Sequence, residues 1–226
     1  MSILSSGIDD FIAPPCLEEI DILFQDEHIL LINKPSGLLS LSGKNPINKD
    51  SVHFRMRDKF PEITLAHRLD LGTSGIMILA LNKTVNANLC RQFQHRSMQK
   101  TYISELMGHL KENVGTIDAP IAKDPENFPV LKICEVTGKA AQSHFQVIAR
   151  LLNPKRTRVL FTPLTGRTHQ LRIHSLAIGH PILGCDLYNS ENSTQLAPRL
   201  LLHAASLEFD HPSTGERIVA HCPCPF

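Results

Sequence analysis

The chain has 226 residues, of which 42% are hydrophobic and 20% charged, which is typical of a globular protein and not of a disordered one. None of its apolar runs reaches the roughly 18 residues that a membrane-spanning helix needs, and no basic segment followed by an apolar one marks a secretory signal. The net charge is only +1, but residues 1–27 hold seven acidic residues and no lysine or arginine, so the remainder carries +8. These features predict a cytoplasmic protein without a membrane partner, and they permit a polyanionic partner without requiring one.

The first half of the chain is predicted to alternate strands with two helices. Residues 1–18 are expected to form an extended acidic lead-in, which leaves residues 19–226 for a single domain. Short apolar runs predict strands over residues 20–24, 29–33 and 76–81. Lys34-Pro35-Ser36-Gly37 is typical of a turn. A first helix is expected over residues 51–60, and a second over residues 84–97, where apolar residues recur every four positions.

The second half is richer in strands. They are predicted over residues 101–107, 130–136, 141–149, 157–162, 200–209 and 217–221. One further helix is expected to begin near Thr168 and to stop at Gly179, with Pro181 just beyond it. Many strands with few helices predict an α+β domain built on a large, mainly antiparallel sheet.

The six cysteines are irregularly spaced and do not predict a disulfide framework. Cys222-Pro223-Cys224 could supply half of a metal site, but no second close pair of ligands accompanies it. We therefore expect no metal ion.

One segment, His67 to Gly75, lies directly before a predicted core strand and combines an acid, an imidazole and a guanidinium. Loops at the ends of core strands commonly present reactive groups, which makes Asp70 a candidate catalytic carboxylate. Thr73 can supply hydrogen bonds that lock the loop. Taken alone, the segment also fits a structural aspartate that caps a turn and pairs with Arg68.

A second segment, Thr165 to His174, gathers basic side chains at the expected start of a helix. A helix N-terminus favours anions, and Arg167, His169 and Arg172 strengthen that preference. A solvated helix start is the alternative. Tyr102, which opens a strand, fits either the core or a platform on which an extruded base stacks.

Taken together, five segments in this order resemble the RluA family of pseudouridine synthases. They are Asn33–Gly37, His67–Gly75, Thr165–His174, Gly179–Gly184 and Leu202–Ala204. The resemblance implies the pseudouridine synthase fold with a central catalytic cleft, and a cofactor-free enzyme that isomerises uridine to pseudouridine in structured RNA. It also implies a monomer without the S4 RNA-binding domain of several members. Compact members act on transfer RNA anticodon stem-loops and on 23S large-subunit ribosomal RNA, so either or both are expected substrates.

The resemblance implies a role for each matching residue. Asp70 aligns with the catalytic aspartate, and Arg172 with the basic residue that pairs with it. Tyr102 aligns with the active-site tyrosine that packs on the target base. Arg68 resembles the arginine inserted into the RNA where the base leaves the stack, and Leu171 would line the base pocket.

Further RNA contacts are expected from polar and basic residues around these segments. They are His67, Thr73, Arg91, Arg96, Arg156, Arg158, Arg167 and His169. One departure from the family is Cys185, which stands where Gly-Asp-x-x-Tyr would place the aspartate, so the partner of that loop stays open between Cys185 and Asp186.

Two alternatives remain at this point. A non-catalytic RNA-binding or ribosome-assembly factor would keep the basic surface and tolerate loss of Asp70. A carboxylate-dependent glycosidase would need a second acid near Asp70, and no such acid lies in these segments.

Overall fold

The computed structural model describes residues 11–127, 129–189 and 193–226. Residues 1–10 of the expected lead-in lie outside the described residues, and residues 11–18 form neither helix nor strand. The strands are β1 (Asp21–Gln25), β2 (Ile29–Lys34), β3 (Thr64–Leu65), β4 (Ser74–Ala80), β5 (Gln99–Met107), β6 (Val114–Asp118), β7 (Ile121–Lys123), β8 (Leu131–Ile133), β9 (Gln142–Leu151), β10 (Arg156–Pro163), β11 (Leu202–Asp210) and β12 (Arg217–His221). The helices are α1 (Val52–Arg57), α2 (Lys83–His95) and α3 (Gln170–Ala177).

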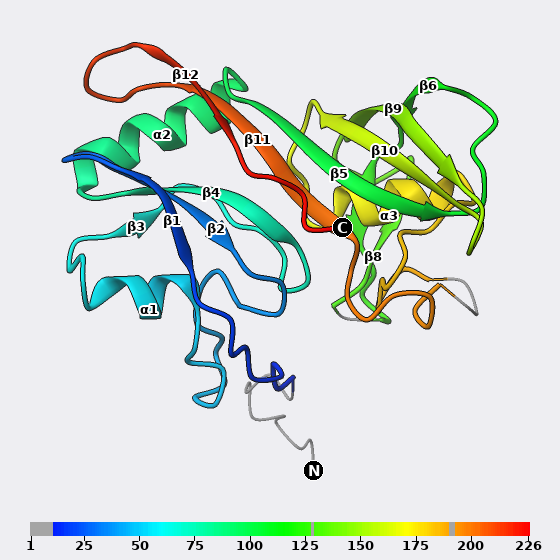
Figure 1. Ribbon diagram of the computed structural model, residues 1–226, viewed down its shortest axis with the longest axis horizontal. Coiled ribbons are helices and arrows are strands. Elements are labelled where there is room, and N and C mark those ends of the chain that lie inside the picture. Colours follow the sequence, from blue (N-terminus) through cyan, green and yellow to red (C-terminus); the bar gives the residue numbers. More distant parts are fainter. Residues whose placement is uncertain (1–10, 128, 190–192) are drawn as a thin grey trace.

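Ten of these strands form one mixed sheet, whose main path runs β1-β2-β4-β11-β5-β10-β9-β6 (Figure 1). Strand β12 pairs with β11 and β3 with β4, while β7 and β8 form a separate pair. Among the described pairs only β4 with β11 is parallel, so the predicted α+β fold with a mainly antiparallel sheet is confirmed. Strand β11 comes late in the chain yet lies between β4 and β5, in the middle of the sheet.

The elements closest to their predicted bounds carry clear local signals. Strand β4 is buried along its whole length, as its apolar run predicted. Ser51 caps α1 by accepting from the Phe54 N–H, and Asn82 caps α2 by accepting from the Val85 N–H. Helix α2 ends at Arg96, which adopts the left-handed conformation with φ 58°.

Other elements differ from the prediction for local reasons. The strand expected over residues 130–136 is only three residues long, because Cys134 begins a tight turn that Gly138 closes by donating to the Cys134 carbonyl at 2.9 Å. Helix α3 begins at Gln170, two residues after Thr168, because the backbone of His169 is in the left-handed conformation with φ 56°. Strands β3, β6 and β7 were not predicted, and each has five residues or fewer.

The sheet carries two hydrophobic cores, one at each end. The first gathers β2, β4 and the buried faces of α1 and α2, and the second gathers β10, α3 and the strands around them. Tyr102 on β5 packs against both cores, so it lies where the two halves of the molecule meet. No helix of the described residues is long and apolar enough to cross a membrane.

Candidate active site

A cleft of about 750 Å³ crosses the middle of the sheet where the two cores meet. The segments around Asp70, Tyr102 and Arg172 all contribute to its lining, so the structure brings together the three regions that the sequence singled out. Asp70 is the only carboxylate among the described residues that line it. The lining cations are Arg68, Arg96, Lys100, Arg167 and Arg172. A cleft with one acid and five cations suits a polyanionic ligand.

The loop that carries Asp70 is fastened to the turn that follows β2. The Ser40 hydroxyl donates to the Leu69 carbonyl at 2.7 Å and accepts from the Leu69 N–H at 3.2 Å. On the other side of Asp70, the Gly37 N–H donates to the Leu71 carbonyl at 2.8 Å, and the Ser36 hydroxyl donates to the Gly72 carbonyl at 2.7 Å. The backbone on both sides of Asp70 is therefore held before any substrate binds.

Lys34 is the centre of this fastening and is fully buried. Its ammonium donates to the carbonyls of Pro35, Leu38 and Leu71 at 2.8, 2.7 and 3.2 Å. Burial lowers the pKa of Lys34 to about 7, while the negative charge of Asp70 acts in the opposite direction. The predicted turn at Lys34-Pro35-Ser36-Gly37 is present, with Gly37 at φ 82°, but the sequence did not reveal that Lys34 joins it to the Asp70 loop.

Arg172 faces Asp70 from the first turn of α3. Its Nη1 lies 3.7 Å from Asp70 Oδ2, and its Nη2 forms a short hydrogen bond with Asp186. Its Nε donates to the Sγ of the buried Cys185 at 3.4 Å. Burial opposes the charged form, but Cys185, Asp70 and Asp186 raise the pKa of Arg172 above its usual value. Cys185, which stands where the family often has an aspartate, and its neighbour Asp186 therefore both contact the Arg172 guanidinium.

His169 faces Asp70 from the residue before α3. Its Nε2 lies 4.0 Å from Asp70 Oδ1, and its Nδ1 lies 2.8 Å from the Tyr188 hydroxyl. That hydroxyl also accepts from the Leu131 N–H at 2.9 Å. Burial lowers the pKa of His169, so the imidazole is neutral near pH 7. Tyr188 was not predicted to be a site residue, although it is one of only two tyrosines in the chain.

Tyr102 lines the cleft from β5. Burial and the nearby charge of Asp70 raise the pKa of its phenol, so the hydroxyl keeps its proton at neutral pH. Lys100 lies two residues earlier on the same strand and also lines the cleft, with its Nζ 5.8 Å from the centre of the Phe93 ring. Burial lowers the pKa of Lys100. Lys100 is thus a cleft residue that the sequence analysis did not predict.

The start of α3 is organised by a glutamine side chain. The Gln170 Oε1 accepts from the Thr165 hydroxyl at 2.7 Å and from the Arg167 N–H at 3.0 Å. The Gln170 Nε2 donates to the Gln142 carbonyl and to Ser143 Oγ on β9. This cap explains why Thr-Gly-Arg-x-His-Gln forms a tight turn here, and the turn sets the positions of His169 and Arg172.

The remaining predicted site residues differ in their exposure. Arg68 and Arg96 are exposed and line the cleft, while Leu171 lines it from a buried position. Thr73 is 2% exposed, and its N–H donates to the Asp70 carbonyl at 3.1 Å, so it shapes the loop from inside. Arg167 lines the cleft and donates from Nε to the Ala140 carbonyl at 3.1 Å.

His67 lies at the cleft but faces the core with one ring nitrogen. Its Nε2 accepts from the Ile78 N–H at 3.1 Å, and its ring packs 4.6 Å from that of Phe93. Burial, helped by Lys100, lowers the pKa of His67 to about 3. His67 is therefore a neutral imidazole that ties the Asp70 loop to β4.

Three arginines expected near RNA lie outside the cleft. Arg91 lines a separate hollow between α2 and the turn that joins β11 to β12. Arg156 and Arg158 form ion pairs with the buried Glu105 at 2.6 and 2.7 Å, so Glu105 offsets their charges. That these three arginines hold RNA phosphates stays a prediction.

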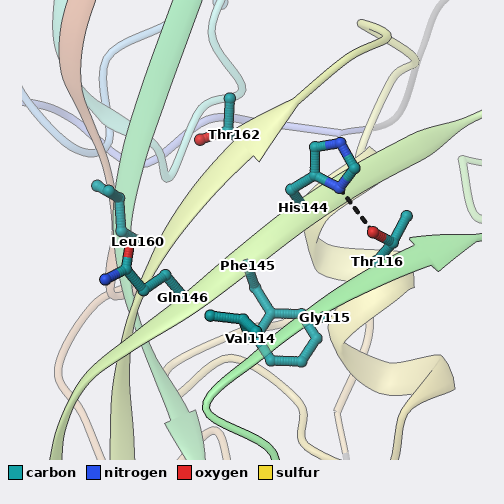
Figure 2. A pocket seen from close by; sticks show the side chains of 8 residues that line it. All are labelled: Val114, Gly115, Thr116, His144, Phe145, Gln146, Leu160 and Thr162. Atoms are coloured by element: carbon teal, nitrogen blue, oxygen red, sulfur yellow. Dashed lines mark hydrogen bonds between the residues drawn. The ribbon is translucent and has the colours of Figure 1, made fainter.

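A smaller hollow of about 360 Å³ lies on β6, β9 and β10 and is shown in Figure 2. Of the described residues that line it, only His144 has an ionisable side chain, and its Nδ1 lies 2.7 Å from the Thr116 hydroxyl. Because this described lining holds no carboxylate, lysine or arginine, the hollow does not compete with the cleft as a site for chemistry. Among the described residues, no cluster of three or more His, Cys, Asp or Glu side chains could hold a metal ion.

Comparison with known proteins identifies close relatives. Residues 28–177 match the family model described as RNA pseudouridylate synthase. The chain is 47% identical over 205 residues to the dual-specificity RNA pseudouridine synthase RluA of Yersinia pestis, covering 91% of this chain and 99% of that protein. It is 43% identical over 213 residues to the protein of the same name from Escherichia coli K12, covering 94% and 97%.

Solved structures agree in fold. The human RNA pseudouridylate synthase domain containing 1 protein superposes with a TM-score of 0.80 at 29% identity, covering 94% of this chain and 86% of that one. The human RNA pseudouridylate synthase domain containing 4 protein superposes with a TM-score of 0.69 at 27% identity, covering 91% and 88%. The expected fold is thereby confirmed.

Proposed function

Because this chain belongs to the RluA family of RNA pseudouridine synthases, we propose that Asp70 is the catalytic carboxylate with which it isomerises uridine in RNA. The chain is an enzyme of this family, and its residue roles are what we propose here. The observation that carries the proposal is that Asp70 is the only carboxylate among the described residues of a cation-lined cleft. The same observation disfavours a glycosidase, which would need a second acid in reach of the scissile bond.

The reaction breaks the C1′–N1 bond, turns the uracil and joins its C5 to C1′. C5 loses a proton and N1 gains one, so the composition is unchanged and no electron donor or acceptor is consumed. Attack of Asp70 on C1′ and removal of a sugar proton by Asp70 both require the ionised carboxylate. The guanidinium of Arg172 lies 3.7 Å from Asp70 Oδ2 and attracts the carboxylate charge that both steps use.

Tyr102 is proposed to pack on the target uracil. Its position between the two cores fixes the ring, and its raised pKa keeps the hydroxyl protonated, so the phenol is poorly suited to act as an anionic base. We therefore assign removal of the C5 proton to a water held by the Tyr102 hydroxyl. Leu171 supplies an apolar wall of the same cleft.

The uridine must leave its stack before it reaches Asp70, which costs a few kcal/mol in a duplex and less in a loop. Arg68 is two residues from Asp70 and exposed, so it is placed to fill the space that the base vacates. Arg96 and Arg167 are proposed to contact phosphates at the cleft, because both line it and carry permanent charge.

Two relatives named dual-specificity RNA pseudouridine synthase cover nearly the whole chain. Combining this dual specificity with the substrates that the family resemblance implies, we propose that the substrates are a transfer RNA anticodon stem-loop and 23S large-subunit ribosomal RNA. We further propose that the enzyme works in the cytoplasm as a monomer, with residues 19–226 as one catalytic unit that needs no cofactor.

The test is tritium release from RNA labelled at uracil C5, with transfer RNA and ribosomal RNA from a strain that lacks this gene. We expect wild type to release tritium from both RNAs, and Asp70→Asn to release none while binding RNA within a few-fold of wild type. Asp70→Asn keeps the size of the side chain and removes its charge. Turnover by this variant would refute the proposed role of Asp70, and release from one RNA only would refute dual specificity.

A further inference from the structure

The Tyr188 hydroxyl connects three segments beside the catalytic cleft. It accepts from the Leu131 N–H of β8 at 2.9 Å and lies 2.8 Å from His169 Nδ1. Tyr188 is 3% exposed, so a hydroxyl proton without an acceptor would be costly there. The rings of Tyr188 and His169 meet edge to face at 5.4 Å, which holds the two side chains in register.

Counting protons at this hydroxyl fixes which nitrogen of His169 is protonated. The Leu131 amide can only donate, so the single hydroxyl proton of Tyr188 has His169 Nδ1 as its acceptor among the described residues. Nδ1 is then bare, and the ring proton lies on Nε2. The opposite arrangement, with Nδ1 as donor, would leave the Tyr188 proton without a partner. Tyr188 thus selects the Nε2-protonated form of the neutral imidazole.

The selected proton faces the catalytic carboxylate. His169 Nε2 lies 4.0 Å from Asp70 Oδ1, while Arg172 Nη1 lies 3.7 Å from Asp70 Oδ2, so each carboxylate oxygen has its own donor. Both contacts are longer than a hydrogen bond, as catalytic contacts often are before substrate binds. The charged and titratable groups around His169 are Asp70, Arg172, Asp186 and Tyr188.

We propose that Tyr188 is a positioning residue that holds His169 as an Nε2–H donor to Asp70, and that this donor sets the orientation of the carboxylate in the transition state. The inference rests on the proposed catalytic role of Asp70. A neutral donor orients the carboxylate without cancelling its charge, which a second cation beside Arg172 would partly do. His169 is held at φ 56°, a conformation that costs most non-glycine residues energy and that is often found at functional sites.

The first test compares Tyr188→Phe with wild type. Phenylalanine keeps the ring that packs against His169 and Arg172 and removes only the hydroxyl. We expect the single-turnover rate at saturating enzyme to fall severalfold, in proportion to the share of His169 that no longer carries the Nε2 proton, with RNA affinity within twofold. His144→Gln, in the separate hollow of Figure 2, is the control for a histidine outside the cleft and should match wild type.

The second test replaces the ring of His169 by amides that imitate one nitrogen each. The amide of His169→Gln can reach the position of Nε2 and donate to Asp70, whereas the amide of His169→Asn reaches only the position of Nδ1 beside Tyr188. Asparagine tolerates the left-handed backbone better than glutamine, so a structural role alone favours Asn over Gln in both folding and turnover. Our proposal requires the reverse order of turnover, with Gln about tenfold faster than Asn.

A double variant and a direct measurement complete the design. Adding Tyr188→Phe to His169→Gln should cost no further activity, because glutamine needs no partner to keep its donor. Nitrogen-15 chemical shifts of labelled histidine should show Nε2–H for wild-type His169 at pH 7, and a mixture of both forms in Tyr188→Phe. An unchanged form in Tyr188→Phe, or Asn at least as active as Gln, would overturn the proposal. Turnover by Asp70→Asn would instead overturn the function proposed above and leave the nitrogen-15 result intact.

Discussion

Arg172 contacts three acceptors at once, one with each nitrogen of its guanidinium. Its planar guanidinium contacts Asp70, Asp186 and Cys185 through three different nitrogens. A lysine has one ammonium at the end of a flexible chain and cannot reproduce this fork. The orientation of the cation, and not only its charge, is therefore what the site uses.

This geometry makes Arg172→Lys a sharp test. We expect kcat to fall about 30- to 100-fold, which corresponds to the roughly 2–3 kcal/mol of a charge-assisted hydrogen bond. Tritium-release kinetics on transfer RNA measure the change. Arg217→Lys is the control, because Arg217 is also an arginine that bridges two carboxylates, Glu208 and Asp210, but lies outside the cleft. An Arg172→Lys enzyme with wild-type kcat would show that charge alone suffices.

Lys34 is unusual because a lysine side chain is normally exposed to solvent, whereas this one is fully buried. The Lys34 ammonium donates its hydrogen bonds to backbone carbonyls inside the protein. Without the ammonium, these carbonyls would be buried without a donor. Lys34→Met keeps the length of the side chain and removes the ammonium. We expect it to lower the free energy of unfolding at pH 7 by about 2–4 kcal/mol, because the Pro35 and Leu38 carbonyls lose their partner.

The stability difference between wild type and Lys34→Met should also change with pH. The folded pKa of Lys34 is about 7 and the ordinary value is 10.5, so between these pH values the unfolded chain binds more protons than the folded one. The free energy of unfolding of wild type should therefore rise by up to roughly 2 kcal/mol between pH 7 and pH 9, and that of Lys34→Met should not show this rise. Urea unfolding at both pH values measures it, and parallel pH profiles for the two proteins would contradict the assignment.

At the scale of the elements, the decisive contact is the parallel pairing of β4 with β11 directly behind the Asp70 loop. Gly75 has φ 113°, and a Cβ added there would lie 2.3 Å from the Ala204 carbonyl oxygen. The Oγ of Ser74, the neighbour of Gly75, lies 2.8 Å from the Nδ1 of His203 on β11. The two strands therefore approach more closely than any side chain at position 75 allows.

Gly75→Ala should separate this pair. We expect this variant to lose about 3 kcal/mol or more of its free energy of unfolding, or to fail to fold. The reason is that backbone atoms of Ala204 cannot move away without breaking the sheet. Gly215→Ala is the matched control, because Gly215 also has positive φ, at 74°, but an added Cβ would meet nothing within 4 Å. The free energy of unfolding of Gly215→Ala should be only about 1–2 kcal/mol below that of wild type. Thermal unfolding compares them, and equal losses would mean that backbone strain, and not the close approach, limits position 75.

The sequence predicted those elements that carry their own local signals. The apolar residues that recur every four positions in α2 and the apolar run of β4 are two such signals, and both elements formed close to their expected bounds. The short strand β6 was missed because its stability comes from pairing with β9, a contact distant in sequence. The site divides in the same way, because Asp70 and Arg172 stand in recognisable segments, whereas Lys34 and Tyr188 act through contacts that only the folded chain creates.

At the scale of the whole molecule, four histidines lie in environments that favour the neutral form. Burial lowers the pKa of His67, His169, His174 and His203. Below pH 6.5 the unfolded chain takes up protons at these positions while the folded chain resists them, so stability falls as the pH is lowered. The molecule should therefore lose stability under mild acid, before its carboxylates are protonated.

His67 provides the numerical check. With a folded pKa of about 3, it alone should lower the free energy of unfolding by roughly 2 kcal/mol between pH 8 and pH 5. The glutamine of His67→Gln keeps an acceptor for the Ile78 N–H but does not titrate. The free energy of unfolding of this variant should therefore fall by roughly 2 kcal/mol less than that of wild type between pH 8 and pH 5. Urea unfolding at the two pH values decides, and an identical loss in both proteins would place the acid sensitivity elsewhere.

The central position of β11 has a consequence for how the protein is made on the ribosome. Strands β4 and β5 are synthesised long before residues 202–210, and the two cannot share a sheet until β11 inserts between them. Until then the nascent chain exposes two unpaired strand edges, one of them the apolar β4. Assembly of the Asp70 loop against β11 is thus postponed to the last stage of translation, and a ribosome that stalls before residue 202 leaves a fragment prone to aggregate.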